Sequence, residues 1–256
     1  MDFALNEIQQ ELKDQARAWL TEKYPLDRDW ENQEDRWSEL EELGWLDVAE
    51  AELGFVEEAL LLEEMGYALY PGPFLAHVTG QNEVFGRGGT IETVDPTRPL
   101  HRLPNGSEET PRLRAAIAAE AVGIAQRALD LGVEHARTRL QFGKPIGTYQ
   151  AVSHPLAQTY TDVELARSLA YWAAWCIAEE DEQAAIAAAA AKAFATEAAV
   201  AACERSIQAH GGIGFTWEHA LHRFYKRALW LEGFGRRPAQ LRLEVADALL
   251  GAAVSA

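Results

Sequence analysis

Cysteine is scarce in this sequence: Cys176 and Cys203 are the only two in 256 residues, too few for a disulfide framework or a cysteine-based metal cage. Both fit small buried apolar residues in a reducing compartment. Basic residues are also few, because 23 Lys and Arg stand against 40 Asp and Glu, for a formal net charge of −17. Such a surface repels phosphate backbones and anionic membranes, so we expect neither nucleic acid nor a membrane as a partner.

Other familiar signatures are missing as well. The sequence begins MDFA, with no basic patch followed by an apolar core, and so predicts a cytoplasmic protein without a signal peptide. The most apolar stretch, residues 184–202, consists mostly of Ala and is interrupted by Lys192 and Glu197, which indicates a close-packed helix rather than a bilayer span. No dinucleotide fingerprint or Walker-type loop occurs, which argues against a Rossmann or P-loop fold.

Helical periodicity dominates what the sequence does contain. Stripes of Leu and aromatic residues predict short helices in an N-terminal helical domain, residues 1–70. Residues 71–111 are punctuated by Gly and Pro and predict a connector, with short strands at most over Gly89–Val94 and Leu100–Leu103. Residues 112–256 predict long antiparallel helices that face one another with small residues. The expected fold is therefore all-α, with an up-and-down four-helix bundle in the C-terminal part.

Two segments between predicted helices suit a ligand. In residues 137–147, RTRLQFGKPIG, guanidinium groups lie beside an aromatic ring and a Gly/Pro turn, which suits phosphate oxygens and a flat heterocycle. Cations that merely complement a helix C-terminus are the alternative there. In residues 208–215, QAHGGIGF, three glycines would let backbone amides approach a ligand closely, although an ordinary helix C-cap needs only one of them.

Two further features bear on chemistry. Glu232 lies among apolar neighbours in the run LEGF, where desolvation would raise the pKa of its carboxyl and suit it to proton abstraction. An exposed surface glutamate is the alternative. His219 and His222 are three residues apart on a predicted helix, but no second ligand motif at bundle spacing accompanies them, so we expect no metal.

These segments resemble the acyl-CoA dehydrogenase family. Residues 115–150, AAIAAEAVGIAQRALDLGVEHARTRLQFGKPIGTYQ, are similar to its paired helices with an Arg-x-Gln-Phe-Gly-x-Pro-Ile turn. Residues 208–228, QAHGGIGFTWEHALHRFYKRA, resemble its Gln-x-x-Gly-Gly-x-Gly signature, in a variant similar to subunits used in bacterial steroid side-chain breakdown. The N-terminal runs MDFALNEIQQELKDQARAWL and ELGWLDVAEAELG are similar too, so the resemblance covers most of the chain.

The resemblance implies a flavin enzyme that dehydrogenates an acyl-CoA. A carboxylate would take the proton from Cα, FAD would accept the hydride from Cβ, and an electron-transfer flavoprotein would be the next acceptor. Oligomerisation would be a condition of cofactor binding, because two neighbouring subunits would hold each FAD. The residues implied to bind FAD are Arg139 at the pyrophosphate, Phe142 at the adenine end, Gln150 at the nucleotide and, on the FAD of a neighbouring subunit, Gln208, Gly211 and Gly212.

The sequence departs from the family where a middle β-domain is expected. That domain has roughly a hundred residues, the size of an ordinary small domain, and it normally covers the flavin ring and one side of the acyl chain. Only the connector of residues 71–111 stands in its place. The run VDPTRPLHRL, residues 94–103, resembles the exit of that domain, so we expect most of the β-domain to be deleted.

The catalytic base is the second departure. The run LEGF echoes the family's Tyr-Glu-Gly-Thr, but counting from Gly211 puts the expected carboxylate near Phe234. The other family location falls at Leu113, which cannot abstract a proton. The family's usual Arg-Asp-Ala reads KRA at residues 226–228, a reversal of charge. Glu232 is the candidate base, unless the carboxylate belongs to another chain or is missing.

We therefore expect an acyl-CoA dehydrogenase subunit that lacks the β-domain and shares FAD with a full-length homologue or with a second copy of itself. An exposed flavin would lack the dry pocket that hydride transfer requires. A bulky acyl-CoA, such as a steroid side-chain thioester, is the expected substrate. The alternatives are a non-catalytic scaffold that keeps the bundle as an assembly surface, and a helical bundle unrelated to flavin.

Overall fold

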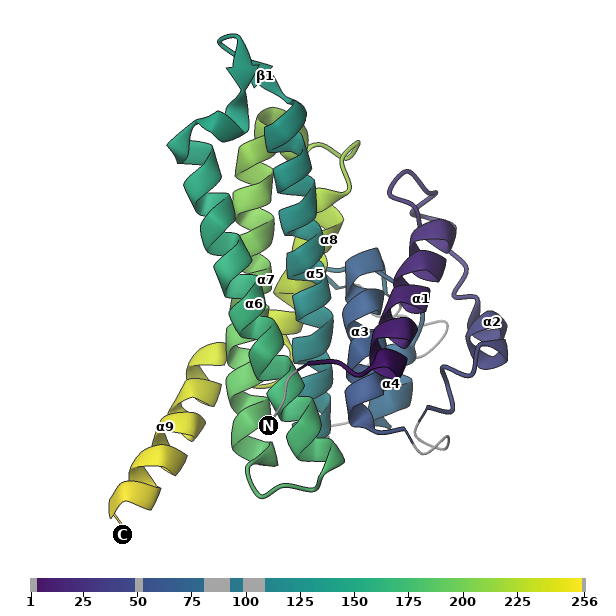
Figure 1. Ribbon diagram of the computed structural model, residues 1–256, viewed down its shortest axis with the longest axis vertical. Coiled ribbons are helices and arrows are strands. Elements are labelled where there is room, and N and C mark those ends of the chain that lie inside the picture. Colours follow the sequence, from purple (N-terminus) through teal and green to yellow (C-terminus); the bar gives the residue numbers. More distant parts are fainter. Residues whose placement is uncertain (1–3, 49–52, 81–92, 99–108, 255–256) are drawn as a thin grey trace.

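The computed structural model describes residues 4–48, 53–80, 93–98 and 109–254, and its regular structure is almost entirely helical (Figure 1). The expected all-α fold is confirmed. The elements in chain order are α1 (Glu7–Lys23), α2 (Trp37–Glu42), α3 (Phe55–Ala68), α4 (Phe74–Thr79), α5 (Pro111–Thr138), β1 (Leu140–Gln141), β2 (Lys144–Pro145), η1 (Ile146–Thr148), α6 (Gln150–Ala178), α7 (Ala184–His210), η2 (Gly211–Phe215), α8 (Leu221–Gly233) and α9 (Pro238–Val254).

The long helices α5, α6 and α7 form an up-and-down bundle with the shorter α8, as the sequence predicts. α7 lies at its centre, because it packs against α5, α6 and α8 and also against the start of α9. Its Ala-rich sequence allows these neighbours to approach closely, and most of its residues are buried. Residues Ala184–Phe215 are long and apolar enough to cross a membrane by length and composition, but a buried core helix meets the same criterion.

The N-terminal helices α1 to α4 cover one side of the bundle (Figure 1). α3 is buried along almost its whole length, since α1 packs on one side of it and α5 and α6 pack on the other. α4 lies inside the segment predicted as an irregular connector and packs against α5, so that prediction is wrong for residues 74–79. The Pro and Gly residues on either side of this segment suggested that no helix could form there. In the structure Pro73 is the N-cap of a short buried helix, a place where proline is tolerated.

Two glycines make the crossing of α3 and α5 possible. A Cβ atom on Gly123 would lie 1.8 Å from the carbonyl oxygen of Glu63, and one on Gly66 would lie 2.1 Å from the carbonyl oxygen of Glu120. Both distances are far inside van der Waals contact, so the two helix backbones touch directly. This crossing fixes the N-terminal helices against the bundle.

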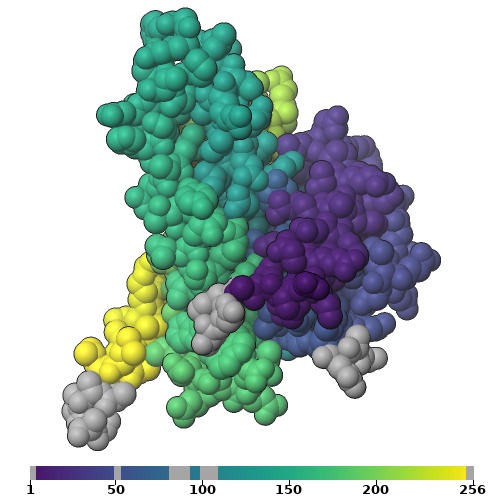
Figure 2. Space-filling view, viewed as in Figure 1, coloured from purple at the N-terminus to yellow at the C-terminus, as the bar shows by residue number. Residues whose placement is uncertain are grey.

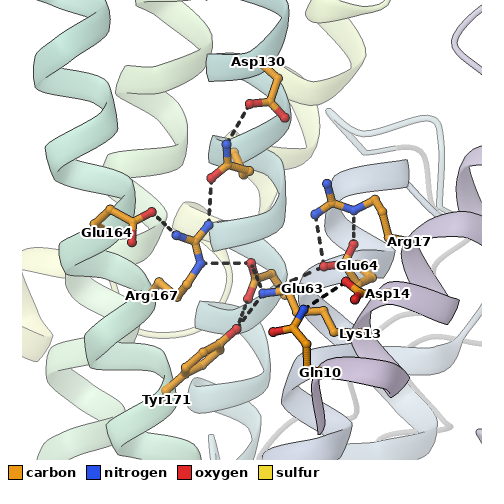
Figure 3. Close-up of polar contacts among 11 residues, drawn as sticks. Gln10, Lys13, Asp14, Arg17, Glu63, Glu64, Asp130, Glu164, Arg167 and Tyr171 are labelled. Carbon is orange, nitrogen blue, oxygen red and sulfur yellow. Dashed lines mark hydrogen bonds and ion pairs between the residues drawn. The ribbon is translucent and has the colours of Figure 1, made fainter. Parts of the chain in front are cut away.

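A buried carboxylate joins α1, α3 and α6 (Figure 3). The Glu63 carboxylate accepts hydrogen bonds from Lys13 Nζ at 3.0 Å, Arg167 Nε at 3.1 Å and the Tyr171 hydroxyl at 2.6 Å. Burial alone would raise the pKa of Glu63, but Lys13 and Arg167 hold that pKa below its usual value. Each partner comes from an element other than α3, so the cluster acts as a polar link between the two halves of the fold.

The described residues contain one small sheet, the antiparallel hairpin of β1 and β2. The predicted strand at Leu100–Leu103 lies outside the described residues, as does most of Gly89–Val94; the described Thr93 and Val94 are not in a strand. The division of the chain at residues 70 and 111 into an N-terminal helical domain, a connector and a bundle stays a prediction.

Candidate functional site

One end of the bundle collects the sequence-predicted ligand residues. α5 ends and α6 begins there, joined by the β hairpin and η1, and α7 ends and α8 begins there, joined by η2. Figure 1 shows the hairpin projecting beyond the helices at this end. We call residues 135–152 and 208–222 the hairpin end. The up-and-down topology explains why the loops after α5 and α7 lie together, because helices that alternate in direction bring alternate loops to the same end.

Phe142 stands at the tip of the hairpin in a strained backbone conformation. Phe142 and Gly143 form a two-residue turn between the paired strands, with φ of 51° and 79°. Two successive positive φ angles are typical of a type I′ turn, which favours Asn-Gly and disfavours a bulky residue. Phe142 is also 92% exposed, so no burial of its ring compensates for this backbone conformation. Arg139, the C-cap of α5, is exposed beside it.

The glycine turn after α7 has an open part and a packed part. Gly211 follows the helix with a φ of 66°, and a Cβ atom on Gly211 or Gly212 would meet nothing within 4 Å. On Gly214 a Cβ atom would lie 2.8 Å from the carbonyl oxygen of Ile207. Gly214 therefore serves the packing of the turn, while the first two glycines leave bare backbone that a ligand can approach.

Gln208 faces an open groove of about 530 Å³ between α6 and α7. Gln150, the first residue of α6, is exposed next to this groove, since its neighbour Ala151 is part of the lining. Gln208 itself lines the groove, whereas Gln150 lies one residue before the first lining residue on α6. The lining residues are Ala151, Val152, Pro155, Glu204, Arg205, Gln208 and Ala209.

All six candidate cofactor residues are exposed. Large apolar side chains are exposed among them, with Ile213 at 49%, Phe215 at 75% and Trp217 at 70%. Figure 2 shows the teal hairpin and the adjoining helix ends projecting beyond the rest of the molecule, with the segment 208–222 mostly behind them in this view. Exposed apolar groups gathered in one region are typical of a surface that another molecule covers. The hairpin end therefore presents all six candidate residues on an exposed surface.

Glu232, the candidate base, lies away from the hairpin end. It stands in the last turn of α8, eleven residues beyond Leu221, which at 1.5 Å per residue places it about 16 Å along the helix. Its side chain is half-buried. Burial raises the pKa of its carboxyl, the carboxylates of Glu197 and Glu204 raise it further, and Arg237 opposes them. The predicted direction of this pKa shift is thus present, but the structure does not join Glu232 to the cofactor candidates.

His219 and His222 were expected on one helix, but His219 lies in the turn before α8, and the two rings pack against different neighbours. The ring of His219 lies 4.5 Å from that of His210, whereas the ring of His222 lies 4.6 Å from that of Trp217. Within the described part of the chain, no group of three or more His, Cys, Asp or Glu residues could hold a metal ion.

Comparison with known proteins identifies the family. The family described as "Acyl-CoA dehydrogenase, C-terminal domain" matches residues 108–247, more than half of the chain. This chain belongs to the acyl-CoA dehydrogenase family. The matched residues include α5 to α8 and therefore the whole hairpin end. FAD, the cofactor expected from the resemblance, is the cofactor of this family.

Curated relatives match this acyl-CoA dehydrogenase chain over part of their length. The acyl-CoA dehydrogenase IpdE2 of Mycobacterium tuberculosis is 45% identical over 148 residues, which are 54% of this chain and 44% of the relative. The probable acyl-CoA dehydrogenase YngJ of Bacillus subtilis is 42% identical over 138 residues, 54% of this chain and 36% of the relative. The chain thus spans less than half the length of these relatives.

Solved structures share the fold over nearly the whole chain. A structure described as the Tcur3481–Tcur3483 steroid ACAD superposes with a TM-score of 0.80 at 23% identity, covering 97% of this chain and 99% of that chain. The ChsE4–ChsE5 complex from Mycobacterium tuberculosis gives a TM-score of 0.77 at 21% identity, covering 98% and 99%. At these identities the likeness establishes the fold.

The residues at the hairpin end fit one side of an FAD site. Arg139 offers an exposed guanidinium for phosphate oxygens, Phe142 an exposed ring for the adenine, and Gly211 and Gly212 offer bare backbone where a side chain would project. These groups are all exposed, so the described residues could contact one side of the cofactor.

A buried ion-pair network around Arg227 was not predicted from the sequence. This side chain is fully buried and pairs with Asp95, with Glu120 at 2.7 Å and with the Thr97 hydroxyl at 2.8 Å; Arg98 pairs with the same Glu120. Two guanidinium groups and two carboxylates balance in charge, which is what permits their burial.

The network also explains the charge reversal in the run KRA. Arg227 on α8 holds residues 95–98 against α5, because it pairs with both Asp95 and Glu120; these residues lie in the run 94–103 that resembles the exit of the β-domain. The reversed charge at Arg227 was the only sign of this network in the sequence. The acidic partners of Arg227 could not be identified, because Asp95 and Glu120 are distant from it along the chain.

Proposed function

We propose that this chain is a subunit of a flavin-dependent acyl-CoA dehydrogenase that shares FAD with a full-length homologue. One observation carries the proposal: every candidate cofactor residue lies on the surface at the hairpin end, among exposed aromatic side chains. A partner that covers this end would supply the missing wall and exclude water, which strengthens the electrostatic interactions inside the site. A second copy of this chain is the alternative partner.

The chemistry divides between the cofactor and this chain. Bound FAD would accept the hydride that leaves Cβ of the acyl-CoA. The Glu232 carboxylate would accept the proton that leaves Cα, so that a Cα=Cβ double bond forms and the thioester is otherwise unchanged. A raised pKa suits a carboxylate to this role, because it makes the group a stronger base. An electron-transfer flavoprotein would then reoxidise the cofactor.

A bulky acyl-CoA is the proposed substrate class. Support comes from the sequence QAHGGIGFTWEH and from a solved neighbour that is described as a steroid ACAD. The purified complex would be assayed with a steroid side-chain thioester and with straight-chain thioesters. Faster turnover of the steroid thioester is expected, and reaction of straight chains alone would refute the substrate class.

A non-catalytic scaffold is the second candidate, favoured by the distance of Glu232 from the hairpin end. Glu232→Gln in the complex separates the two. If Glu232 is the base, dehydrogenation falls by about 10²- to 10⁴-fold while FAD stays bound. Glu179→Gln, an exposed glutamate at the far end of α6, is the matched control and keeps the full rate. An unchanged rate in Glu232→Gln would assign the base to the partner and leave this chain a structural role.

A further inference from the structure

The last helix, α9, carries apolar residues on two opposite faces. One face packs against α7, where Leu241 is fully buried and Val245 packs beside it. Leu243 follows Leu241 by two residues and so points to the other side of the helix, where it is 65% exposed; Leu250, two turns later, is 65% exposed as well. A helix that is apolar on opposite faces is typical of one that is covered on both sides.

The exposed face of α9 is a regular seam. Apolar residues recur along it at spacings of four, three and four residues, which is the period of a coiled-coil seam. Alanine and leucine alternate at these positions. The four residues that we call the α9 seam are Ala239, Leu243, Ala246 and Leu250. Ala246 is half-buried and the other three are exposed.

The second half of α9 stands clear of the rest of the molecule. Figure 1 shows the helix running obliquely away from the lower half of the bundle, in the direction away from the hairpin. In Figure 2 it is a yellow projection beside the bundle. Leu249, at the edge of the seam, is 61% exposed. Three large apolar side chains thus lie exposed on one projecting helix, and an apolar patch of this kind is typical of a contact surface.

We propose that the α9 seam joins two copies of this chain as an antiparallel, two-fold symmetric helix pair. Such a pair can set a leucine against an alanine in every layer. Leu243 then meets Ala246 of the second copy, and Leu250 meets Ala239 of the second copy. The seam is thus complementary to itself, as a two-fold interface requires. The small alanines let the two helices approach closely.

Charge also favours pairing at this helix. The chain carries a net charge of −17, so two copies repel each other over most of their surfaces. Residues 236–254 are an exception, because they contain three arginines and two acidic residues. The antiparallel register brings Asp247 of each helix level with Arg242 of the other, so the two chains meet with opposite charges beside the seam. The seam lies away from the hairpin end, and the inference therefore does not rest on the proposed function.

Sedimentation equilibrium of the full chain, purified alone, tests the pairing over a range of concentrations. We expect a reversible equilibrium between monomer and dimer. Leu243→Glu should raise the dissociation constant at least tenfold, because it would place two carboxylates in an apolar seam. Ile8→Glu, which introduces the same charge at a position 64% exposed on α1, is the matched control and should leave the dissociation constant unchanged. A chain that stays monomeric, or a dimer that Leu243→Glu does not weaken, would overturn the inference.

Disulfide trapping tests the antiparallel arrangement. Cys176 and Cys203 are buried, so the unmodified chain should form no disulfide between copies. A mixture of Ala239→Cys and Leu250→Cys chains should form the mixed disulfide, since these positions face each other in the proposed pair. The two positions are eleven residues apart, about 16 Å along the helix, so like positions cannot meet in an antiparallel pair. Disulfides between two Ala239→Cys chains would show a parallel pair and refute the proposal.

A full-length homologue is the other occupant that the test can reveal. If the chain alone is monomeric and Leu243→Glu weakens its complex with the homologue, the α9 seam belongs to that complex and its assignment to a second copy is wrong. Flavin content measured on the same samples reports separately on the proposed function. A chain that dimerises through the seam but binds no flavin with the homologue would uphold the inference and refute the proposed function.

Discussion

Phe142 combines an unfavourable backbone conformation with an exposed side chain. A phenylalanine with a φ of 51° and a side chain 92% exposed gains nothing from the hydrophobic core. Left-handed backbone costs such a residue on the order of 1 kcal/mol or more. Strained backbone of this kind is often found at functional sites; under the proposed function the exposed ring would contact the cofactor.

Replacing Phe142 by Asn is therefore expected to separate stability from binding. Asn followed by Gly is the preferred type I′ turn, so Phe142→Asn should raise the free energy of unfolding by about 1 kcal/mol in urea denaturation. Binding of FAD by the complex should weaken, because the stacking ring is gone. Tyr160→Gln, another exposed aromatic residue, is the control and should leave FAD binding unchanged. Full FAD affinity in Phe142→Asn would contradict the role of the ring.

The candidate site residues were predictable from sequence because their motif is local. Arg139 and Phe142 stand in one turn, and Gly211 and Gly212 in another. Arg227 could not be assigned in the same way, since its partners Asp95 and Glu120 come from distant segments. Long-range pairing of this kind leaves no periodic signal in a single sequence.

At the scale of elements, the crossing of α3 and α5 depends on backbone contact. Gly66 and Gly123 face carbonyl groups of the opposite helix, and neither position leaves room for a methyl group. The helices themselves were predictable from their hydrophobic periodicity. The crossing was not, because a glycine within a helix looks the same in sequence whether it faces a neighbour or solvent. α4 was missed for a related reason, as prolines at its start also resemble a loop.

Gly123→Ala is expected to destabilise the fold strongly. Its Cβ atom would lie 1.8 Å from the Glu63 carbonyl oxygen, so the helices must separate, at a cost of about 3 kcal/mol or more in the free energy of unfolding. Gly251→Ala on α9 is the matched control, because its Cβ atom meets nothing within 4 Å and alanine favours a helix. Equal melting temperatures for the two variants would show that the crossing is not tight.

The turn between α7 and α8 is expected to lose stability in acid through His219. The pKa of this ring falls from 6.5 to about 4 on folding, so below pH 6.5 the unfolded chain binds a proton that the folded chain does not. Stability should be fully present above pH 6.5 and should decline as the pH falls towards 4. Because the ring is partly exposed, the loss should be on the order of 1 kcal/mol.

Comparison with His219→Asn separates the acid-induced loss of stability that His219 causes from that caused by other titrating groups. Urea denaturation at several pH values should show a smaller acid loss in the variant than in the unmodified chain. Parallel curves for the two proteins would assign the acid sensitivity to other residues.

At the scale of the whole molecule, the bundle and its N-terminal helices form a continuous core, while the hairpin end stands uncovered. Sequence length already predicted that the connector was too short for the family's β-domain. The sequence did not reveal which contacts stabilise the fold in the absence of the β-domain. The Arg227 network anchors residues 95–98 against α5, and the Glu63 cluster links the N-terminal helices to the bundle.

Visible flavin absorbance most directly tests whether this chain holds one side of a shared FAD site. The chain would be purified alone and together with a full-length acyl-CoA dehydrogenase homologue, and the ratio of flavin to protein measured in each. We predict little or no flavin on the chain alone and stoichiometric flavin on a complex of the two. A complex without flavin, or a monomer that holds FAD stoichiometrically by itself, would contradict this account.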